Sequence, residues 1–424
     1  PPKHGSILLL LAMRLIYEIV IRLYRLTIIL ASVVNPKARG WVKGRQQIFS
    51  QLAGGLRDEK DKLAWFHCAS LGEFEQGRPV IEKFKAHYPD YKILLTFFSP
   101  SGYEVRKNYP GADYIYYLPA DTRVNAWRFY QIVKPDVLFL VKYEYWYNYI
   151  DILAKHDVPV FVISGIFRRS QHFFKWYGFW FRRHLRKVKY FFLQDEDSAK
   201  LLTTINVENI IVSGDTRFDR VMEIAEKSVL PEKVVRFCNN ERVLVCGSTW
   251  PVDETYLAGA LKTLPKDVKL IIAPHEIDAS HIEKIVEIFG ADSAIPYSSY
   301  IPEKDKHRIL ILDCIGVLSA VYRCASVAYV GGGFGKGMHN ILEATAYGIP
   351  VIFGPNNKKF PEAQGLADIE GGFEVSDQES INRILSELLT NKEKYIHACE
   401  ASAGFMSKNR GASGKVFSVL ETKI

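Results

Sequence analysis

The chain has 424 residues, of which 48% are hydrophobic and 24% are charged, and its formal net charge is +8. This composition is that of a globular protein rather than a disordered one, and the length predicts two domains, each with its own core. The six cysteines form no C-x-x-C pair, which argues against a metal site or disulfide framework and predicts free thiols in a reducing compartment. The modest basic excess suits an anionic partner.

Residues 7–34 form a strongly apolar segment that also carries four charges. Arg14, Glu18, Arg22 and Arg25 are spaced so that on a helix they form one polar stripe. Because four charges at bilayer depth are costly, we expect a membrane-surface or shallowly inserted helix. A helix docked on the protein's own core is the alternative.

Short apolar strand patterns alternate with helical patterns in two blocks. In the first block we expect strands over residues 63–68, 93–98, 137–141, 158–164 and 190–193, with helices such as 77–87 and 125–133 between them. In the second block we expect strands over 243–246, 268–273, 309–312, 327–330 and 351–353, with helices such as 254–264 and 279–289. This alternation predicts an α/β protein with two parallel sheets, each covered on both faces. A charged segment at about 219–241 marks the seam, and the crevice between the domains is the expected active site.

Two glutamates follow predicted strands of the first block. Glu73 lies three residues after Ser70, the spacing of a capping box, and helix capping alone would explain both residues. The functional alternative is a general base at the carboxyl end of a strand. Glu144 lies in the aromatic segment 142–148, where it either faces the same crevice or is a solvated turn residue.

Two further motifs concern phosphate and metal binding. Arg217 follows residues 210–212 near the seam and suits a phosphate or carboxylate, with pairing to Asp219 as the alternative. The Asp195-Glu196-Asp197 run has the form of a metal–diphosphate motif, but a helix is expected to begin there. Acidic residues in a first helical turn explain the run, so no metal is expected.

Residues 168–189 mix eight lysines and arginines with seven aromatic residues. We expect this segment to contact a phosphorylated lipid surface, with core packing and single-stranded nucleic-acid binding as alternatives. The candidate cations of this surface are Arg168, Arg169, Lys175, Arg182 and Arg183.

A glycine-rich segment follows the predicted strand 327–330. Gly331, Gly332, Gly333, Gly335 and Gly337 precede a helix expected over 340–347, which together predict an anion site made of free N–H groups and a helix N-terminus. The spacing fits neither the dinucleotide fingerprint nor the P-loop, which argues against NAD binding and ATP hydrolysis. A nucleotide held by another geometry is expected, and a glycine turn without a ligand is the alternative.

Together these motifs resemble the bacterial 3-deoxy-D-manno-oct-2-ulosonic acid (Kdo) transferases of lipopolysaccharide synthesis. The resemblance covers nearly the whole chain from about residue 13 and rests on segments 70–73, 144–148, 214–219, 337–343, 354–355 and 360–362. It implies a GT-B fold, in which two Rossmann-like domains with parallel sheets face a central cleft, plus the membrane-associated helix 7–34. Residues 35–220 are then the acceptor-binding domain and 221–424 the CMP-sugar-binding domain, whose last helix is a candidate for packing back on the first.

The resemblance also implies inverting transfer of Kdo from CMP-Kdo to a glucosamine hydroxyl of a lipid A precursor such as lipid IVA. It implies no cofactor, no metal and no nucleic acid, and a location at the cytoplasmic face of the bacterial inner membrane; no oligomeric state is predicted. Glu73 matches the catalytic base, Glu144 a second functional carboxylate and Glu343 the ribose-binding position. The donor side is expected to comprise Arg217, Ser248, Thr249, Pro274, His275, Gly332, Gly333, Gly337, His339, Asn340 and Glu343. The rival hypotheses are another GT-B enzyme acting on a UDP-sugar, as transferase or epimerase, and a lipid-surface protein without activity.

Overall fold

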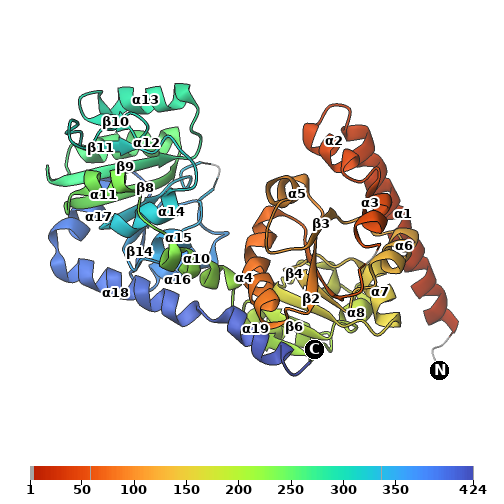
Figure 1. Cartoon of the computed structure of the whole chain (residues 1–424). Helices are drawn as coiled ribbons and strands as arrows, with labels where there is room; N and C mark the ends of the chain where they lie inside the picture. Colours follow the sequence, from red (N-terminus) through yellow and green to blue (C-terminus); the bar gives the residue numbers. More distant parts are fainter. Residues whose placement is uncertain (1–3, 58, 336, 424) are drawn as a thin grey trace. The chain divides into compact units, whose positions relative to one another are not determined.

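The computed structural model describes residues 4–57, 59–335 and 337–423, and the chain divides into two compact units. The first unit comprises Pro1–Arg220 together with Gly411–Ile424, and the second comprises Val221–Arg410. The end of the chain joins the first unit because helix α19 (Ala412–Leu420) packs against helix α4 (Leu71–His87), as Figure 1 shows.

The first unit is built on a seven-stranded parallel sheet with the order β3-β2-β1-β4-β5-β6-β7. Its strands are β1 (Lys62–Cys68), β2 (Tyr91–Phe97), β3 (Tyr114–Tyr117), β4 (Val137–Val141), β5 (Val160–Gly165), β6 (Tyr190–Leu193) and β7 (Ile210–Val212). Alternate residues of β1 enter two different cores: Leu63 and Trp65 pack on one face, and Ala64 and Phe66 on the other. Both faces are therefore buried, which explains the continuous apolar runs of the central strands.

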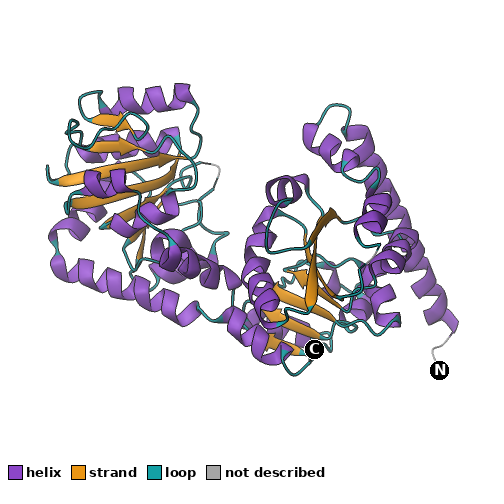
Figure 2. Ribbon diagram, viewed as in Figure 1, coloured by secondary structure: helices purple, strands orange, loops and turns teal. Residues whose placement is uncertain are grey.

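Helices cover both faces of this sheet (Figure 2). Besides α4 and α19, they are α1 (His4–Ala31), α2 (Pro36–Lys43), α3 (Ile48–Gly55), α5 (Pro100–Arg106), α6 (Arg123–Val133), α7 (Tyr147–Lys155), α8 (Phe179–Leu185) and α9 (Glu196–Thr203). Helix α10 (Thr216–Lys227) begins in the first unit and ends in the second.

The second unit has its own seven-stranded parallel sheet, with the order β10-β11-β9-β8-β12-β13-β14. Its strands are β8 (Arg242–Thr249), β9 (Val268–Pro274), β10 (Ala294–Pro296), β11 (Ile309–Ile311), β12 (Val327–Val330), β13 (Val351–Phe353) and β14 (Gly372–Glu374). Its helices are α11 (Glu232–Cys238), α12 (Pro251–Leu261), α13 (Ala279–Phe289), α14 (Leu318–Val321), α15 (Leu342–Thr345), α16 (Pro361–Ala367), α17 (Gln378–Thr390) and α18 (Lys392–Asn409).

The predicted α/β class with two parallel sheets is confirmed, and the differences from the sequence analysis lie at the edges. Strands β3, β7, β10 and β14 were not among the expected strands, and all four are edge strands of three or four residues. The helix expected over 340–347 is helical only in α15, over four residues.

Helix α1 docks on the first unit along one side and exposes apolar residues along the rest. Ile21 is buried in a cluster with Trp41 and Ala120, and the Tyr17 hydroxyl donates a hydrogen bond of 2.6 Å to the Asp121 carboxylate. Part of the expected polar stripe also faces the protein, because Glu18 accepts hydrogen bonds from Asn148 and the backbone of Arg123. Large exposed side chains of α1 include Leu8, Leu11, Leu15, Leu23 and Leu30. Within the described ranges, no helix is both long enough and apolar enough to cross a bilayer.

Candidate active site

Glu73 lies in the first turn of α4, immediately after the carboxyl end of β1. Ser70 is the N-cap of α4 and accepts a hydrogen bond from the Glu73 backbone N–H at 3.4 Å. The Glu73 carboxylate accepts a hydrogen bond from the backbone N–H of Ala69. The expected capping interaction is therefore present, yet it leaves the Glu73 side chain only 4% exposed.

Burial and, to a smaller extent, the neighbouring Glu144 carboxylate raise the pKa of Glu73 to about 8, against the Ala69 N–H and Lys142. Burial also raises the pKa of Glu144 to about 7. The structure thus brings the two predicted carboxylates near one another at the carboxyl ends of β1 and β4. A desolvated site with a second carboxylate nearby disfavours the ionised form of Glu73, and such perturbed groups cluster at functional sites.

Lys142 connects this carboxylate pair to the segment that carries Arg217. Its backbone has φ +70°, a left-handed conformation that is unfavourable for a side chain with a Cβ. Burial lowers the pKa of Lys142, as does the nearby Arg217, while Asp215 and Glu73 raise it. Arg217 pairs with Asp215 at 2.7 Å, and the Asp219 carboxylate accepts hydrogen bonds from the backbone N–H groups of Gly411 and Ser413. The first unit therefore gathers Glu73, Glu144, Asp215 and two cations at one end of its sheet.

A buried network that the sequence does not predict fixes the Glu144 segment. The indole N–H of Trp146 donates to His67 Nε2 at 2.9 Å, so the His67 proton lies on Nδ1, 2.9 Å from the Thr96 hydroxyl. Burial lowers the pKa of His67 to about 3, which keeps this ring neutral. The Phe98 ring stacks on Trp146 at 4.8 Å. No local pattern reveals this network, because His67 and Trp146 are 79 residues apart.

The second unit places a stack of three rings beside its glycine-rich segment. His275 lies 4.8 Å from Trp250 and 4.4 Å from His339, measured between ring centroids. The Trp250 N–H also donates to His339 Nε2 at 3.1 Å. Burial lowers the pKa of His339, and His275 lowers it further, so a neutral ring is favoured. The predicted His275 and His339 are thereby brought together, and Trp250 is an additional member that the sequence does not indicate.

The glycine-rich segment needs its glycines for close backbone approach. Gly332 has φ +87°, and a Cβ there would lie 2.5 Å from the Gly337 carbonyl. A Cβ on Gly333 would lie 2.6 Å from the backbone of Gly354. Asp253, on α12, accepts hydrogen bonds from the Gly332 N–H at 2.9 Å and from the Tyr329 hydroxyl at 2.6 Å. This buried carboxylate holds the segment in place, and the sequence analysis did not single it out.

The other predicted donor residues surround the same strand ends. Ser248 has φ +54°, and Thr249 pairs with Pro274 across the β8–β9 edge, where the His275 N–H donates to the Thr249 carbonyl at 2.9 Å. Asn340 donates to the Glu343 carboxylate at 3.2 Å. Because α15 has only four residues, its dipole contributes little, and an anion here would depend on backbone N–H groups. Arg217, by contrast, belongs to the first unit.

The basic aromatic segment 168–189 serves mainly as core. Phe173 and Trp180 are buried, and Phe174, Phe179 and Phe181 pack against the same cluster. Only Trp176 and Tyr177 are largely exposed aromatics of this segment. Arg182 donates to the Phe173 and Lys175 carbonyls and so braces the turn. Exposed cations remain at Arg168, Arg169, Lys175 and Arg183. In the Asp195-Glu196-Asp197 run, Asp195 caps α9 by accepting a hydrogen bond from the Ser198 N–H at 2.6 Å.

The chain is similar in sequence to known Kdo transferases. Residues 43–220 match the family described as 3-deoxy-D-manno-octulosonic-acid transferase (kdotransferase). The chain is 28% identical to the 3-deoxy-D-manno-octulosonic acid transferase of Aquifex aeolicus, over 78% of this chain and 87% of that protein. It is 26% identical to the enzyme of the same name from Haemophilus influenzae, over 92% and 93% respectively. The chain is thus similar to Kdo transferases, in residues 43–220 by the family match and over most of its length by these relatives.

Kdo transferases are glycosyltransferases, and both predicted catalytic glutamates lie inside the matched range of residues 43–220. The predicted GT-B type is confirmed by the likeness to UDP-GlcNAc 2-epimerase from Neisseria meningitidis, solved bound to UDP-GlcNAc. That structure is 16% identical, has a TM-score of 0.61, and is matched over 86% of this chain and 100% of its own. Because this likeness shows the fold alone, the sequence relatives are what distinguish a Kdo transferase from a UDP-sugar epimerase.

Proposed function

We propose that the chain transfers Kdo from CMP-Kdo to a glucosamine hydroxyl of a lipid A precursor such as lipid IVA, with inversion at the anomeric carbon. The observation that carries the proposal is the buried Glu73 carboxylate beside Glu144 at the carboxyl ends of two strands. A general base needs a pKa near the working pH, and a value of about 8 meets this condition.

In the proposed reaction, Glu73 accepts the proton of the sugar hydroxyl as the hydroxyl oxygen forms a bond to the anomeric carbon of Kdo. The bond between that carbon and the CMP phosphate oxygen breaks, and CMP leaves with the electron pair. Attack on the face opposite to CMP inverts the centre. Glu144 and Lys142 set the proton affinity of Glu73, since one raises its pKa and the other lowers it.

On the donor side, we propose that the backbone N–H groups of the glycine-rich segment receive the CMP phosphate and that Glu343 binds the ribose. The ring stack of Trp250, His275 and His339 offers flat surfaces and imidazole nitrogens for the sugar carboxylate or the base. A single phosphate carries little enough charge for N–H donors and Arg217 to neutralise, so the proposed transfer needs no metal and no cofactor.

We further propose that the protein works at the cytoplasmic face of the inner membrane, held by α1 and the exposed cations of residues 168–183. The support is the row of exposed leucines on α1, which a soluble surface rarely carries. Replacing Leu15 and Leu23 by Glu should release the protein from vesicles of inner-membrane lipids. The matched control replaces the exposed Val235 and Ile288 of the second unit by Glu and should leave binding unchanged.

The decisive experiment incubates the protein with CMP-Kdo and a defined lipid A precursor, followed by mass spectrometry of the lipid and measurement of released CMP. The expected result is one or more Kdo units on the lipid with equal release of CMP. The fold likeness favours one rival, a UDP-sugar epimerase. Epimerisation of UDP-GlcNAc without CMP release would replace the proposed function by that one.

A further inference from the structure

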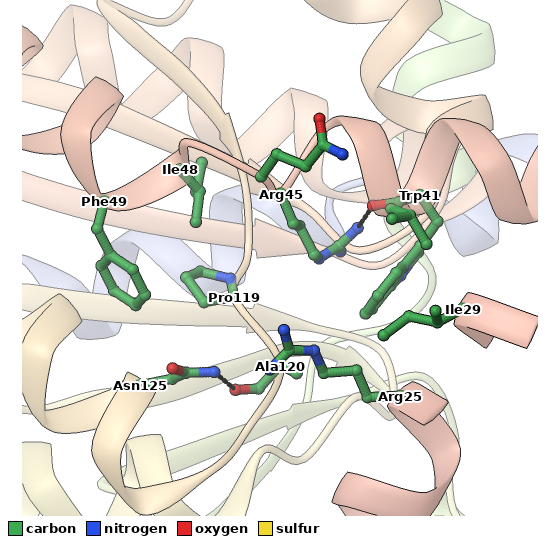
Figure 3. A pocket seen from close by; sticks show the side chains of 11 residues that line it. Arg25, Ile29, Trp41, Arg45, Ile48, Phe49, Pro119, Ala120 and Asn125 are labelled. Atoms are coloured by element: carbon green, nitrogen blue, oxygen red, sulfur yellow. Dashed lines mark hydrogen bonds between the residues drawn. The ribbon is translucent and has the colours of Figure 1, made fainter. Parts of the chain in front are cut away.

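A pocket of about 360 Å³ lies wholly within the first unit, between α1, α2, α3 and the segment that joins β3 to α6 (Figure 3). Its polar lining consists of the guanidinium groups of Arg25 and Arg45 and the carboxamides of Gln46 and Asn125. No aspartate or glutamate is among the described residues that line it. The pocket is therefore a concave surface with two positive charges and no counter-charge of its own.

Arg45 is the inner cation of this pocket. Its guanidinium donates to the carbonyls of Leu118, Trp41 and Phe98, and these bonds use three of its five N–H groups. Two N–H groups remain, and the described residues offer Arg45 no carboxylate. Burial lowers the pKa of Arg45 to about 9. A desolvated cation without an ion partner is costly, and an incoming anion relieves that cost.

Arg25 is the outer cation and comes from a different element. It is exposed, extends from α1, and reaches across the pocket toward Ala120 in Figure 3. Two positive charges that face one pocket repel each other unless an anion lies between them. The planar forks of two arginines match the oxygens of a phosphate, whereas a single cation would offer no such geometry.

The rest of the pocket is apolar and continues toward the exposed side of α1. Ile29, Ile48 and Phe49 line its walls, and Leu26 and Leu30 are exposed on the same helix. A free phosphate would gain nothing from these side chains, but a phosphate attached to acyl chains would bury them. We propose that this pocket binds the phosphomonoester headgroup of a membrane lipid, with Arg25 and Arg45 on the phosphate oxygens. The proposed acceptor is itself a phosphorylated lipid, so this inference rests on the proposed function, but its test uses neither the donor nor that acceptor.

The alternative is that Arg45 only braces α2 against the ends of β2 and β3. Bracing requires neither Arg25 nor Gln46, so variants at these two exposed residues test the lipid site without disturbing Arg45. Arg25→Glu and Gln46→Glu place a negative charge in the pocket. The matched controls Lys37→Glu and Gln47→Glu make the same charge changes at exposed residues outside the lining. Unfolding midpoints confirm that all four variants fold.

Binding is measured with phosphatidylcholine vesicles that carry phosphatidic acid, a phosphomonoester, or phosphatidylserine at matched surface charge. We expect the protein to bind phosphatidic acid vesicles about tenfold more tightly. Arg25→Glu and Gln46→Glu should abolish this preference, and Lys37→Glu and Gln47→Glu should keep it. Equal affinity of the unmodified protein for both vesicles, or a preference that survives in both pocket variants, overturns the proposal. Equally tight binding of glycerol phosphate in solution would assign the pocket to a free phosphate instead. A failed transfer assay leaves these outcomes unchanged, because no donor is present.

Discussion

Replacing Glu73 by Gln should remove a pH dependence from the stability of the first unit. The Glu73 carboxyl has a pKa of about 8 in the folded chain, against an ordinary value of 4.5. The folded chain therefore binds this proton more tightly than the unfolded chain does. Stability is greatest below pH 4.5 and falls as the pH rises toward 8. Between about pH 5 and about pH 8 the loss amounts to about 3 kcal/mol from this one group.

The variant Glu73→Gln has nearly the same shape but cannot ionise. Its carbonyl oxygen can still accept the Ala69 N–H, while its buried NH₂ group costs about 1–3 kcal/mol if it finds no partner. We therefore expect the unfolding free energy of the unmodified protein to fall by about 3 kcal/mol relative to that of the variant as the pH rises across the same range. The transfer rate should fall by roughly 10²–10⁴-fold, because an amide cannot take up the hydroxyl proton.

The cysteines provide an assay for the first unit alone. Cys68 is buried in β1, and the other cysteines, from Cys238 to Cys399, belong to the second unit. Urea unfolding at each pH, followed by a short alkylation pulse and mass spectrometry of the Cys68 peptide, gives the stability of the first unit. The control Glu208→Gln changes an exposed carboxyl of the same unit. Identical pH profiles for the unmodified protein and Glu73→Gln would refute the buried, protonated carboxyl.

Three further outcomes are expected. Tyr17→Phe removes a donor from the buried Asp121 carboxylate, which should lower the unfolding free energy of the first unit by about 1–3 kcal/mol in the Cys68 assay; an unchanged midpoint contradicts the docking of α1. Gly333→Ala should abolish CMP binding in calorimetry, because its Cβ would lie 2.6 Å from the Gly354 backbone, whereas Gly335→Ala meets nothing within 4 Å and should bind normally. Transfer should persist in EDTA, and a loss that Mg²⁺ restores would contradict metal independence.

The central strands of both sheets follow directly from the sequence, because strands buried on both faces must be apolar throughout. Residues 137–141, 190–193, 327–330 and 351–353 were each predicted with the observed bounds. The edge strands β3, β7, β10 and β14 could not be found in this way, since they are short and one side of each lacks a partner strand. The apolar pattern that identifies a strand in the sequence results from burial, and short edge strands show little of this pattern.

Residues of the candidate site could be predicted only where each one directly follows a strand that the sequence itself reveals. Glu73, Glu144 and the glycine-rich segment all follow strands that the sequence reveals. Asp253 was not predicted, because its role depends on Gly332, 79 residues away. The aromatic residues of 168–189 were misjudged for a related reason: their composition suits a lipid surface, but tertiary packing decides that Phe173 and Trp180 lie in the core.

The choice between capping and catalysis for Glu73 can be weighed by the magnitudes of the two effects. The capping interactions of an N-terminal turn contribute about 1 kcal/mol, and Gln is as suitable as Glu at this position. Burying an ionisable carboxyl next to Glu144 costs about 3 kcal/mol near neutral pH, from the shift of its pKa to about 8. Glutamine would provide the cap without this pH-dependent loss, and it costs about 1–3 kcal/mol only if its buried NH₂ group finds no partner, so capping alone does not favour glutamate here. A carboxyl group that lowers the stability of its own unit by this amount is expected at a site where the reaction needs a group that takes up a proton.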